Sequence, residues 1–137
     1  MPRNPRIVVT QDDYSRLRRL ASHPKLAAEL QSADVVDSTS ISPDIVTMNS
    51  RVVFVDETTE ECREVIIVFP HEFDASGGRV SVLAPVGTAL LGLAAGQSIV
   101  WPFPDGTSHT LRVLRISYQP EAAGGARRPN RNANKRA

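Results

Sequence analysis

Hydrophobic residues follow a helical period near the start of the chain and a strand-like period after residue 44. Tyr14, Leu17 and Leu20 recur at helical spacing, and arginines take the remaining faces. Thr10 precedes an acid, Asp13, by three residues, a spacing that satisfies free amides at a helix start. The pattern therefore predicts an amphipathic helix that begins just after Thr10.

Pro24 divides this helix from a second one. It lacks an amide proton and disfavours helical geometry in His23, but it suits the first turn of a following helix. Leu26 and Leu30 continue the apolar face and the connection is short, so we expect a short antiparallel helical hairpin over residues 1–37. Each arm has roughly 12 residues and reaches about 18 Å. The tip of this hairpin consists of Ser22, His23, Pro24 and Lys25.

A polar segment that contains a proline, residues 38–44, predicts a linker, and strand-like alternation begins after it. Val46, Met48 and Phe54 alternate with polar neighbours, and an acidic turn then leads to an apolar run over residues 65–69. These two segments predict an antiparallel pair of strands.

The remaining strands and one short helix are expected after residue 79. Strands are predicted over residues 80–84, 98–101 and 107–118, and a helix is predicted over residues 86–91. Gly92 can end that helix in the left-handed conformation. In the last strand the apolar residues change face between Val113 and Leu114, which predicts a β-bulge. The fold class is therefore α+β, a helical hairpin followed by an antiparallel β-domain over residues 45–120 with one short helix.

Charge divides the chain into an acidic body and a basic end. Residues 1–121 carry 11 Lys and Arg and all 15 Asp and Glu, a net −4, whereas residues 122–137 carry +5. Since this end has no apolar residue larger than alanine, we expect residues 121–137 to be disordered. Its cations offer a weak, sequence-blind contact to nucleic acid. They are Arg127, Arg128, Arg131, Lys135 and Arg136.

Cysteine content and hydropathy bear on the compartment. The single cysteine, Cys62, excludes an internal disulfide and every multi-cysteine zinc site. The chain has no apolar stretch of 18 residues, and its N-terminus does not resemble a signal peptide. We therefore expect a cytoplasmic protein without membrane contact.

No group of residues points to catalysis, a metal or a cofactor. His23, His71 and His109 lack metal-ligand spacing and are interpreted as solvated side chains. The paired acids have local explanations at helix starts and turns. We therefore expect neither an enzyme nor a small-molecule substrate.

One enzymatic alternative stays open. Six aromatic side chains could line an apolar pocket such as prolyl isomerases use, although a β-domain core explains them more simply. They are Phe54, Phe69, Phe73, Trp101, Phe103 and Tyr118.

The segment from Val80 to Gly92 (VSVLAPVGTALLG), with its following glycine turn and the turn at residues 104–106, resembles the C-terminal domain of the bacterial transcript-cleavage factors GreA and GreB. A closer resemblance, to their relative the regulator of nucleoside diphosphate kinase (Rnk), rests on two other segments. These are residues 45–52 (IVTMNSRV) and 118–122 (YQPEA). The similarity spans about residues 44–122.

This resemblance implies an FKBP-like β-domain that docks on bacterial RNA polymerase near the secondary channel, with the hairpin entering the channel. The family's docking segment corresponds in this chain to Leu83, Ala84, Pro85 and Val86. The cleavage factors carry acidic residues at the tip of a long coiled coil, where they help to hold a metal ion. Because the tip of this chain has no acid, we expect a transcription elongation modulator that binds polymerase without stimulating transcript cleavage and competes with the factors that do.

Overall fold

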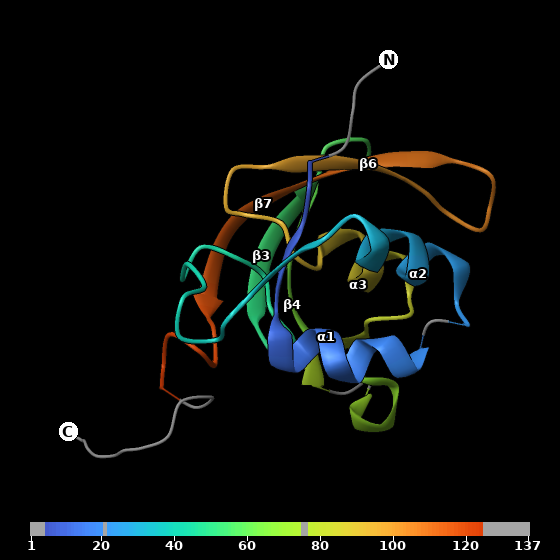
Figure 1. Ribbon diagram of the computed structural model, residues 1–137. Coiled ribbons are helices and arrows are strands. Elements are labelled where there is room, and N and C mark those ends of the chain that lie inside the picture. Colours follow the sequence, from blue (N-terminus) through green and yellow to red (C-terminus); the bar gives the residue numbers. More distant parts are fainter. Residues whose placement is uncertain (1–4, 21, 75–76, 125–137) are drawn as a thin grey trace.

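The computed structural model describes residues 5–20, 22–74 and 77–124 of the chain, in which a curled sheet holds the helices on its concave side (Figure 1). The N-terminal elements are β1 (Val8–Thr10), α1 (Gln11–Leu17), the 3-10 turn η1 (Arg18–Leu20), α2 (Pro24–Gln31) and β2 (Asp34–Val36). The later elements are β3 (Arg51–Asp56), β4 (Glu61–Val68), the 3-10 turn η2 (Pro70–Glu72), β5 (Arg79–Ser81), α3 (Pro85–Leu90), β6 (Ser98–Pro102) and β7 (Ser108–Tyr118). The predicted α+β class is confirmed.

The main sheet has five strands in the order β5-β4-β3-β7-β6. Its neighbours are antiparallel except β4 and β5, which run parallel, so an entirely antiparallel domain was wrong at this edge. The predicted bulge is confirmed, because Val53 pairs with Arg115 and Phe54 with Val113, which leaves Leu114 as the extra residue. The bulge lets β7 bury Val113 while Leu114 stays 44% exposed.

The N-terminal residues do not form a simple helical hairpin. β1 and β2 flank the two helices and pair with each other in parallel, from Val8 opposite Asp34 to Thr10 opposite Val36. The arms are also shorter than predicted, with 7 residues in α1 and 8 in α2. The helix starts are as expected, since Thr10 accepts a hydrogen bond from the Asp13 amide (3.0 Å) and Pro24 opens α2.

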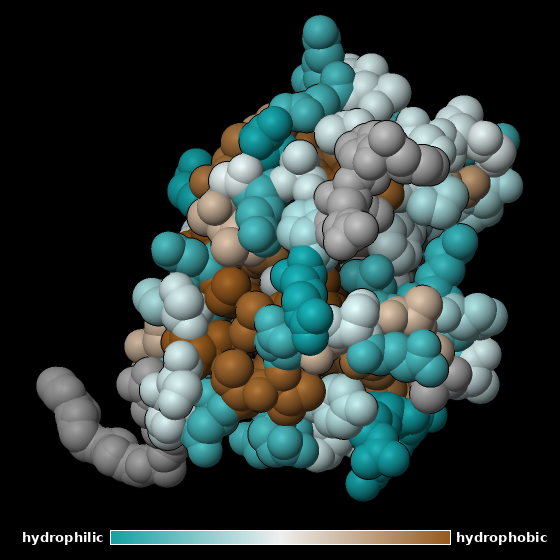
Figure 2. All heavy atoms as spheres, turned by 45° about the horizontal axis from the view of Figure 1, so that its top comes forward, coloured by the Kyte–Doolittle hydropathy of each residue, from teal (hydrophilic) through white to brown (hydrophobic). Residues whose placement is uncertain are grey.

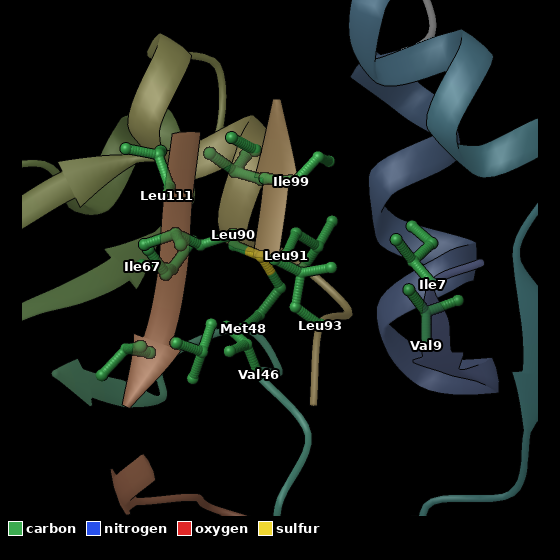
Figure 3. Close-up of a cluster of buried hydrophobic side chains, with 14 of the residues drawn as sticks. Ile7, Val9, Val46, Met48, Ile67, Leu90, Leu91, Leu93, Ile99 and Leu111 are labelled. Atoms are coloured by element: carbon green, nitrogen blue, oxygen red, sulfur yellow. The ribbon is translucent and has the colours of Figure 1, made fainter. Parts of the chain in front are cut away.

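One hydrophobic core joins the N-terminal elements to the β-sheet. Leu17, Leu26 and Leu30 belong to the same buried cluster as Phe54 and Ile67. Figure 3 shows Ile7 and Val9 beside the buried side chains of the sheet, of α3 and of the loop before β3. The apolar face of the helices is therefore covered by this chain's own β-domain.

Two predicted boundaries differ from the structure. The segment predicted as a linker, residues 38–44, places Ile41 in the interior at 6% exposure. Disorder from residue 121 was wrong for the first part of that segment, because Glu121 is 4% exposed and ordered by a side-chain hydrogen bond. Residues 125–137, the rest of that prediction, lie outside the described residues.

On one face of the molecule, hydrophobic side chains gather in a central area bordered by hydrophilic ones (Figure 2). The large hydrophobic residues with the greatest exposure include Phe73 (53%) and Tyr118 (48%). Among the described helices, none is long and apolar enough to cross a membrane.

Candidate functional site: an apolar cavity between the helical tip and the start of α3

The predicted docking segment, residues 83–86, forms the entry into α3. Ala84 is extended and Pro85 occupies the first turn, where its missing amide proton costs nothing. The Leu83 amide donates to the Ser81 hydroxyl (3.1 Å), and the Thr88 hydroxyl donates to the carbonyl oxygens of Val82 and Ala84. Local hydrogen bonds therefore fix the segment, whose four side chains are all half-buried.

The predicted tip forms the end of the turn that follows η1 and the first two residues of α2. The His23 amide donates to the Leu20 carbonyl oxygen (3.1 Å), and the His23 carbonyl oxygen accepts from the Ala27 amide (2.9 Å). The side chains of all four tip residues, 22–25, are exposed. The turn thus presents them outward while Leu26, the next residue, anchors α2 in the core at 1% exposure.

The structure brings the tip and the docking segment together around one cavity of about 490 Å³. This volume lies within the range of about 300–1,000 Å³ that ligand pockets occupy. Its lining comprises His23, Pro24 and Lys25 from the tip with the following Leu26, Leu83, Pro85 and Thr88 from α3 and its entry, and Trp101, Pro102, Phe103 and Pro104 from the end of β6 and the turn after it. Apolar side chains dominate this lining, and its charged or titratable members are His23 and Lys25.

Two aromatic side chains form the wall contributed by the end of β6 and the residue that follows it. Trp101 is 5% exposed, and its indole N–H has no hydrogen-bond acceptor among the described residues. A buried donor without a partner costs about 1–3 kcal/mol. Phe103 packs on the His109 ring, with 4.3 Å between ring centroids. Of the six aromatics proposed for an isomerase-like pocket, these two line the cavity.

His109, behind Phe103, joins two β-turns and is not a freely solvated histidine. Its Nδ1 lies 2.6 Å from Asp56 Oδ2, and its Nε2 lies 3.0 Å from the Thr107 hydroxyl. The order of groups is that of a hydrolase triad, but the Thr107 hydroxyl donates its proton to Asp105 (2.6 Å). It is therefore not poised to give that proton to the histidine.

Asp56 holds this network at the start of the β3–β4 turn. Burial raises the pKa of Asp56, but hydrogen bonds from His109, Thr59 and Thr58 together outweigh burial and hold the pKa below its usual 3.8. The contact ties the β3–β4 turn to the β6–β7 turn, and so supports the aromatic wall of the cavity from behind.

A second polar cluster fastens α1 to the β-domain. Asp13 is 2% exposed; it accepts a hydrogen bond from the Met48 amide (3.0 Å) and another from Arg16 (2.8 Å). Nearby, the Thr47 hydroxyl donates to Glu121 (2.7 Å), and the Gln119 side chain donates to the Ile45 carbonyl oxygen (2.8 Å). The loop over residues 45–50 is thus held from both ends of the described chain.

Asp13 and its neighbour Asp12 have different roles. The contacts of Asp13 form a clamp between α1 and the loop over residues 45–50. The sequence suggested that both acids serve the helix start, whereas the Asp13 carboxylate turns inward to the loop. Burial raises the pKa of Asp13 above its usual 3.8, and this outweighs the lowering by the Met48 amide and by Arg16.

Asp13→Ala is expected to destabilise the protein by about 2–3 kcal/mol, because it leaves the buried Met48 amide without an acceptor. Asp12→Ala, at an exposed position one residue away, is the matched control and should change stability by less than about 0.5 kcal/mol. Urea unfolding at pH 7 measures both. Equal effects in the two variants would mean that the clamp does not stabilise the fold.

The raised pKa gives the same side chain a pH signature. The folded protein holds the Asp13 proton to higher pH than the unfolded chain does, so this group favours folding most below pH 3.8 and loses that contribution as pH rises through its folded pKa. Relative to Asp13→Asn, the wild-type protein should therefore lose stability across that window. A difference in unfolding free energy that is flat with pH would contradict the raised pKa.

Sequence reasoning missed the cavity and the polar cluster around Asp13 for the same reason. Trp101, Asp13 and Glu121 belong to segments far apart in the chain, and only the fold brings each to its partners. One usable signal existed, since residues 118–122 carry part of the family resemblance and include Gln119 and Glu121.

Two further predictions concern residues away from the cavity. The basic residues Arg127, Arg128, Arg131, Lys135 and Arg136 lie outside the described residues, so contact of the tail with nucleic acid stays a prediction. Within the described ranges, no three His, Cys, Asp or Glu side chains gather in a way that could hold a metal ion.

A family model, related sequences and a solved structure all identify the same family. Residues 41–118 match the family model described as "Transcription elongation factor, GreA/GreB, C-term". The chain is 40% identical over 129 residues to the regulator of nucleoside diphosphate kinase of Escherichia coli K12, an alignment that covers 88% of this chain and 95% of that protein. It is also 40% identical over 86 residues to the transcription elongation factor GreA of a Chelativorans species, covering 63% of this chain and 54% of that protein.

A solved structure supports the fold as well as the sequence match. The prokaryotic transcription elongation factor GreA/GreB from Nitrosomonas europaea is 43% identical, with a TM-score of 0.66 over 84% of this chain and 100% of that one. The chain therefore belongs to the GreA/GreB family of transcription elongation factors and is related over nearly its whole length to the regulator of nucleoside diphosphate kinase.

Proposed function

We propose that this protein binds bacterial RNA polymerase near the secondary channel, through residues 83–86 and the tip at residues 22–25, and modulates elongation in the cytoplasm without stimulating transcript cleavage. The observation that carries the proposal is the cavity that these two segments share. Because both segments border one cavity, a single surface of a partner can contact them together. The family membership supplies polymerase as the partner class.

The absence of cleavage is proposed from the composition and length of the helical unit. The tip sequence Ser22-His23-Pro24-Lys25 has no carboxylate. The cleavage factors that this chain resembles need acids at the tip to help hold a metal ion. Eight residues of α2 span about 12 Å, so the tip also stays close to the β-domain. We infer a factor that occupies the docking site of the cleavage factors and does not stimulate transcript cleavage there.

Transcript cleavage by stalled elongation complexes tests this proposal. The protein alone should leave the transcript intact, and in excess it should inhibit cleavage by an added GreA-type factor. Leu83→Asp, in the docking segment, should weaken that inhibition at least about tenfold by placing a charge at the contact. Leu114→Asp, at an exposed site on β7 away from the cavity, is the matched control.

The possible results separate three interpretations. Robust cleavage by the protein alone would contradict the silent tip. No inhibition by the wild-type protein would contradict the shared docking site. Equal inhibition by Leu83→Asp and Leu114→Asp would contradict the placement of the contact at residues 83–86.

The FKBP-like interpretation of residues 45–120 suggests a second function, prolyl isomerisation, and the aromatic wall of the cavity is the observation that favours it. Acceleration of cis–trans exchange in a proline peptide, lost in Phe103→Ala, would support an enzyme. If cis–trans exchange proceeds at the uncatalysed rate, the isomerase function is excluded and only the regulatory function remains.

A further inference from the structure

We propose that the cavity between the tip and α3 receives a large apolar side chain from an acidic segment of RNA polymerase. The identity of the partner rests on the proposed function. The chemistry of the occupant follows from the cavity's own walls, from its charge and from one unpaired hydrogen-bond donor.

The walls are apolar, and prolines restrict their backbone at several points. Four prolines line the cavity, each at the boundary of an element: Pro24 at the start of α2, Pro85 at the start of α3, Pro102 at the end of β6 and Pro104 in the turn after it. A proline ring fixes its backbone and has no amide proton to offer a ligand. The hydroxyl of Thr88 is already committed to backbone oxygens. Such a preformed apolar space binds an apolar side chain at little ordering cost.

The rim is positively charged. His23 and Lys25 are exposed at the mouth, and no acidic residue lines the cavity. Lys25 forms no ion pair with another described residue. The stretch from Arg18 to Ala28 contains three cationic residues and no acid, and one of them, Lys25, lines the cavity, so an acidic segment is favoured over a basic one at the mouth.

The indole N–H of Trp101 adds a polar requirement. It is a buried donor in the cavity wall and lacks an acceptor among the described residues. A peptide occupant brings backbone carbonyl oxygens, and one of them can accept this hydrogen bond once binding exposes the N–H, which is inaccessible to solvent in the free protein. Nucleic acid fits less well, because the Trp101 ring is 95% buried and does not offer a face on which a base could stack.

The single tryptophan provides a direct readout. The probe is a capped seven-residue peptide with Leu-Phe-Leu at its centre and two glutamates on each side. We expect a saturable change in Trp101 fluorescence below about 1 mM peptide, a weak affinity in line with a short isolated segment. The same peptide with lysines in place of glutamates, and one with serines in place of the apolar residues, should bind at least about tenfold more weakly.

Charge reversal separates the rim from general electrostatics. Lys25→Glu should weaken peptide binding at least about fivefold, whereas Arg115→Glu, an equal charge change at an exposed position on β7, should leave it unchanged. Phe103→Ser should abolish the response if that variant unfolds at the wild-type temperature. Equal binding of the acidic and basic peptides, no response to any peptide, or tighter binding of an oligouridylate would each overturn the proposal.

Binding to core polymerase distinguishes failure of this inference from failure of the proposed function. If wild-type and Lys25→Glu proteins bind polymerase equally, the proposal for the cavity is overturned and the tip is not part of the contact, while binding of polymerase itself stands. If the wild-type protein does not bind polymerase, the proposed function falls, and polymerase falls with it as the source of the acidic segment. Loss of polymerase binding in Lys25→Glu but not in Arg115→Glu supports both.

Discussion

Gly87→Ala is expected to destabilise the protein by about 3 kcal/mol or more. A Cβ atom at this position would overlap the Ser81 carbonyl oxygen and lie 2.9 Å from the Ser81 carbonyl carbon and 3.0 Å from Val82 Cα. These are backbone atoms of β5 and of the residue after it, so no side-chain rotation can relieve the contact. Either α3 moves away from β5 or the strand end shifts.

Gly87 also lies one residue after the proposed docking segment, so the shift should reach function. Urea unfolding measures the loss of stability. At low temperature, where part of the Gly87→Ala protein stays folded, that folded protein should inhibit transcript cleavage more weakly than the wild type. Gly77→Ala is the control, because its Cβ would meet only the Arg79 side chain, at 3.9 Å. A Gly87→Ala protein as stable as Gly77→Ala would show that α3 is not packed as closely on β5 as the structure indicates.

Gly92→Ala is expected to cost about 3 kcal/mol through two separate causes. Its φ of +81° lies in the left-handed region, where a side chain adds about 1–2 kcal/mol of strain. Its Cβ would also lie 2.5 Å from Ile7 Cβ and 3.1 Å from the Val8 amide nitrogen. Gly92 ends α3, and its carbonyl oxygen accepts from the Val8 amide (3.1 Å), so the change disturbs the seam between the N-terminal elements and the β-domain.

Gly96→Ala separates these two causes. Its φ is +90° and a Cβ there would meet nothing within 4 Å, so it should show the backbone strain alone, about 1 kcal/mol. Thermal and urea unfolding of both variants give the comparison. Equal losses for Gly92→Ala and Gly96→Ala would mean that the contact with Ile7 contributes nothing.

Local signals in the sequence identified most of the elements that surround the site. Strand-like patterns predicted the strands that became β3, β4, β6 and β7, with a continuous apolar run in the case of β4, and the change of face at Leu114 predicted the bulge. Thr10, Pro24 and Gly92 marked helix ends because each acts on the backbone next to it. The family resemblance added the segment at residues 83–86, which local pattern alone would not distinguish from any other helix start.

Tertiary structure decided what local patterns could not carry. β1 and β2 have three residues each, too few to display a period, and their parallel pairing depends on the two helices between them. Asp13, Gln119 and Glu121 look like surface residues in the sequence, since only the folded chain supplies the partners that allow their burial.

The cavity shows the same division. Its tip, its docking segment and its aromatic wall were each visible in the sequence as separate features. Their meeting depends on the burial of Leu26 in a core shared with the β-domain, which turns the tip toward α3 and the end of β6. The sequence by itself thus determined the class of fold, the starts of its first two helices and the residues at the tip. The packing of the helical unit onto the sheet decided that those residues border one apolar space, because hydrophobic burial joins segments without regard to their distance along the chain.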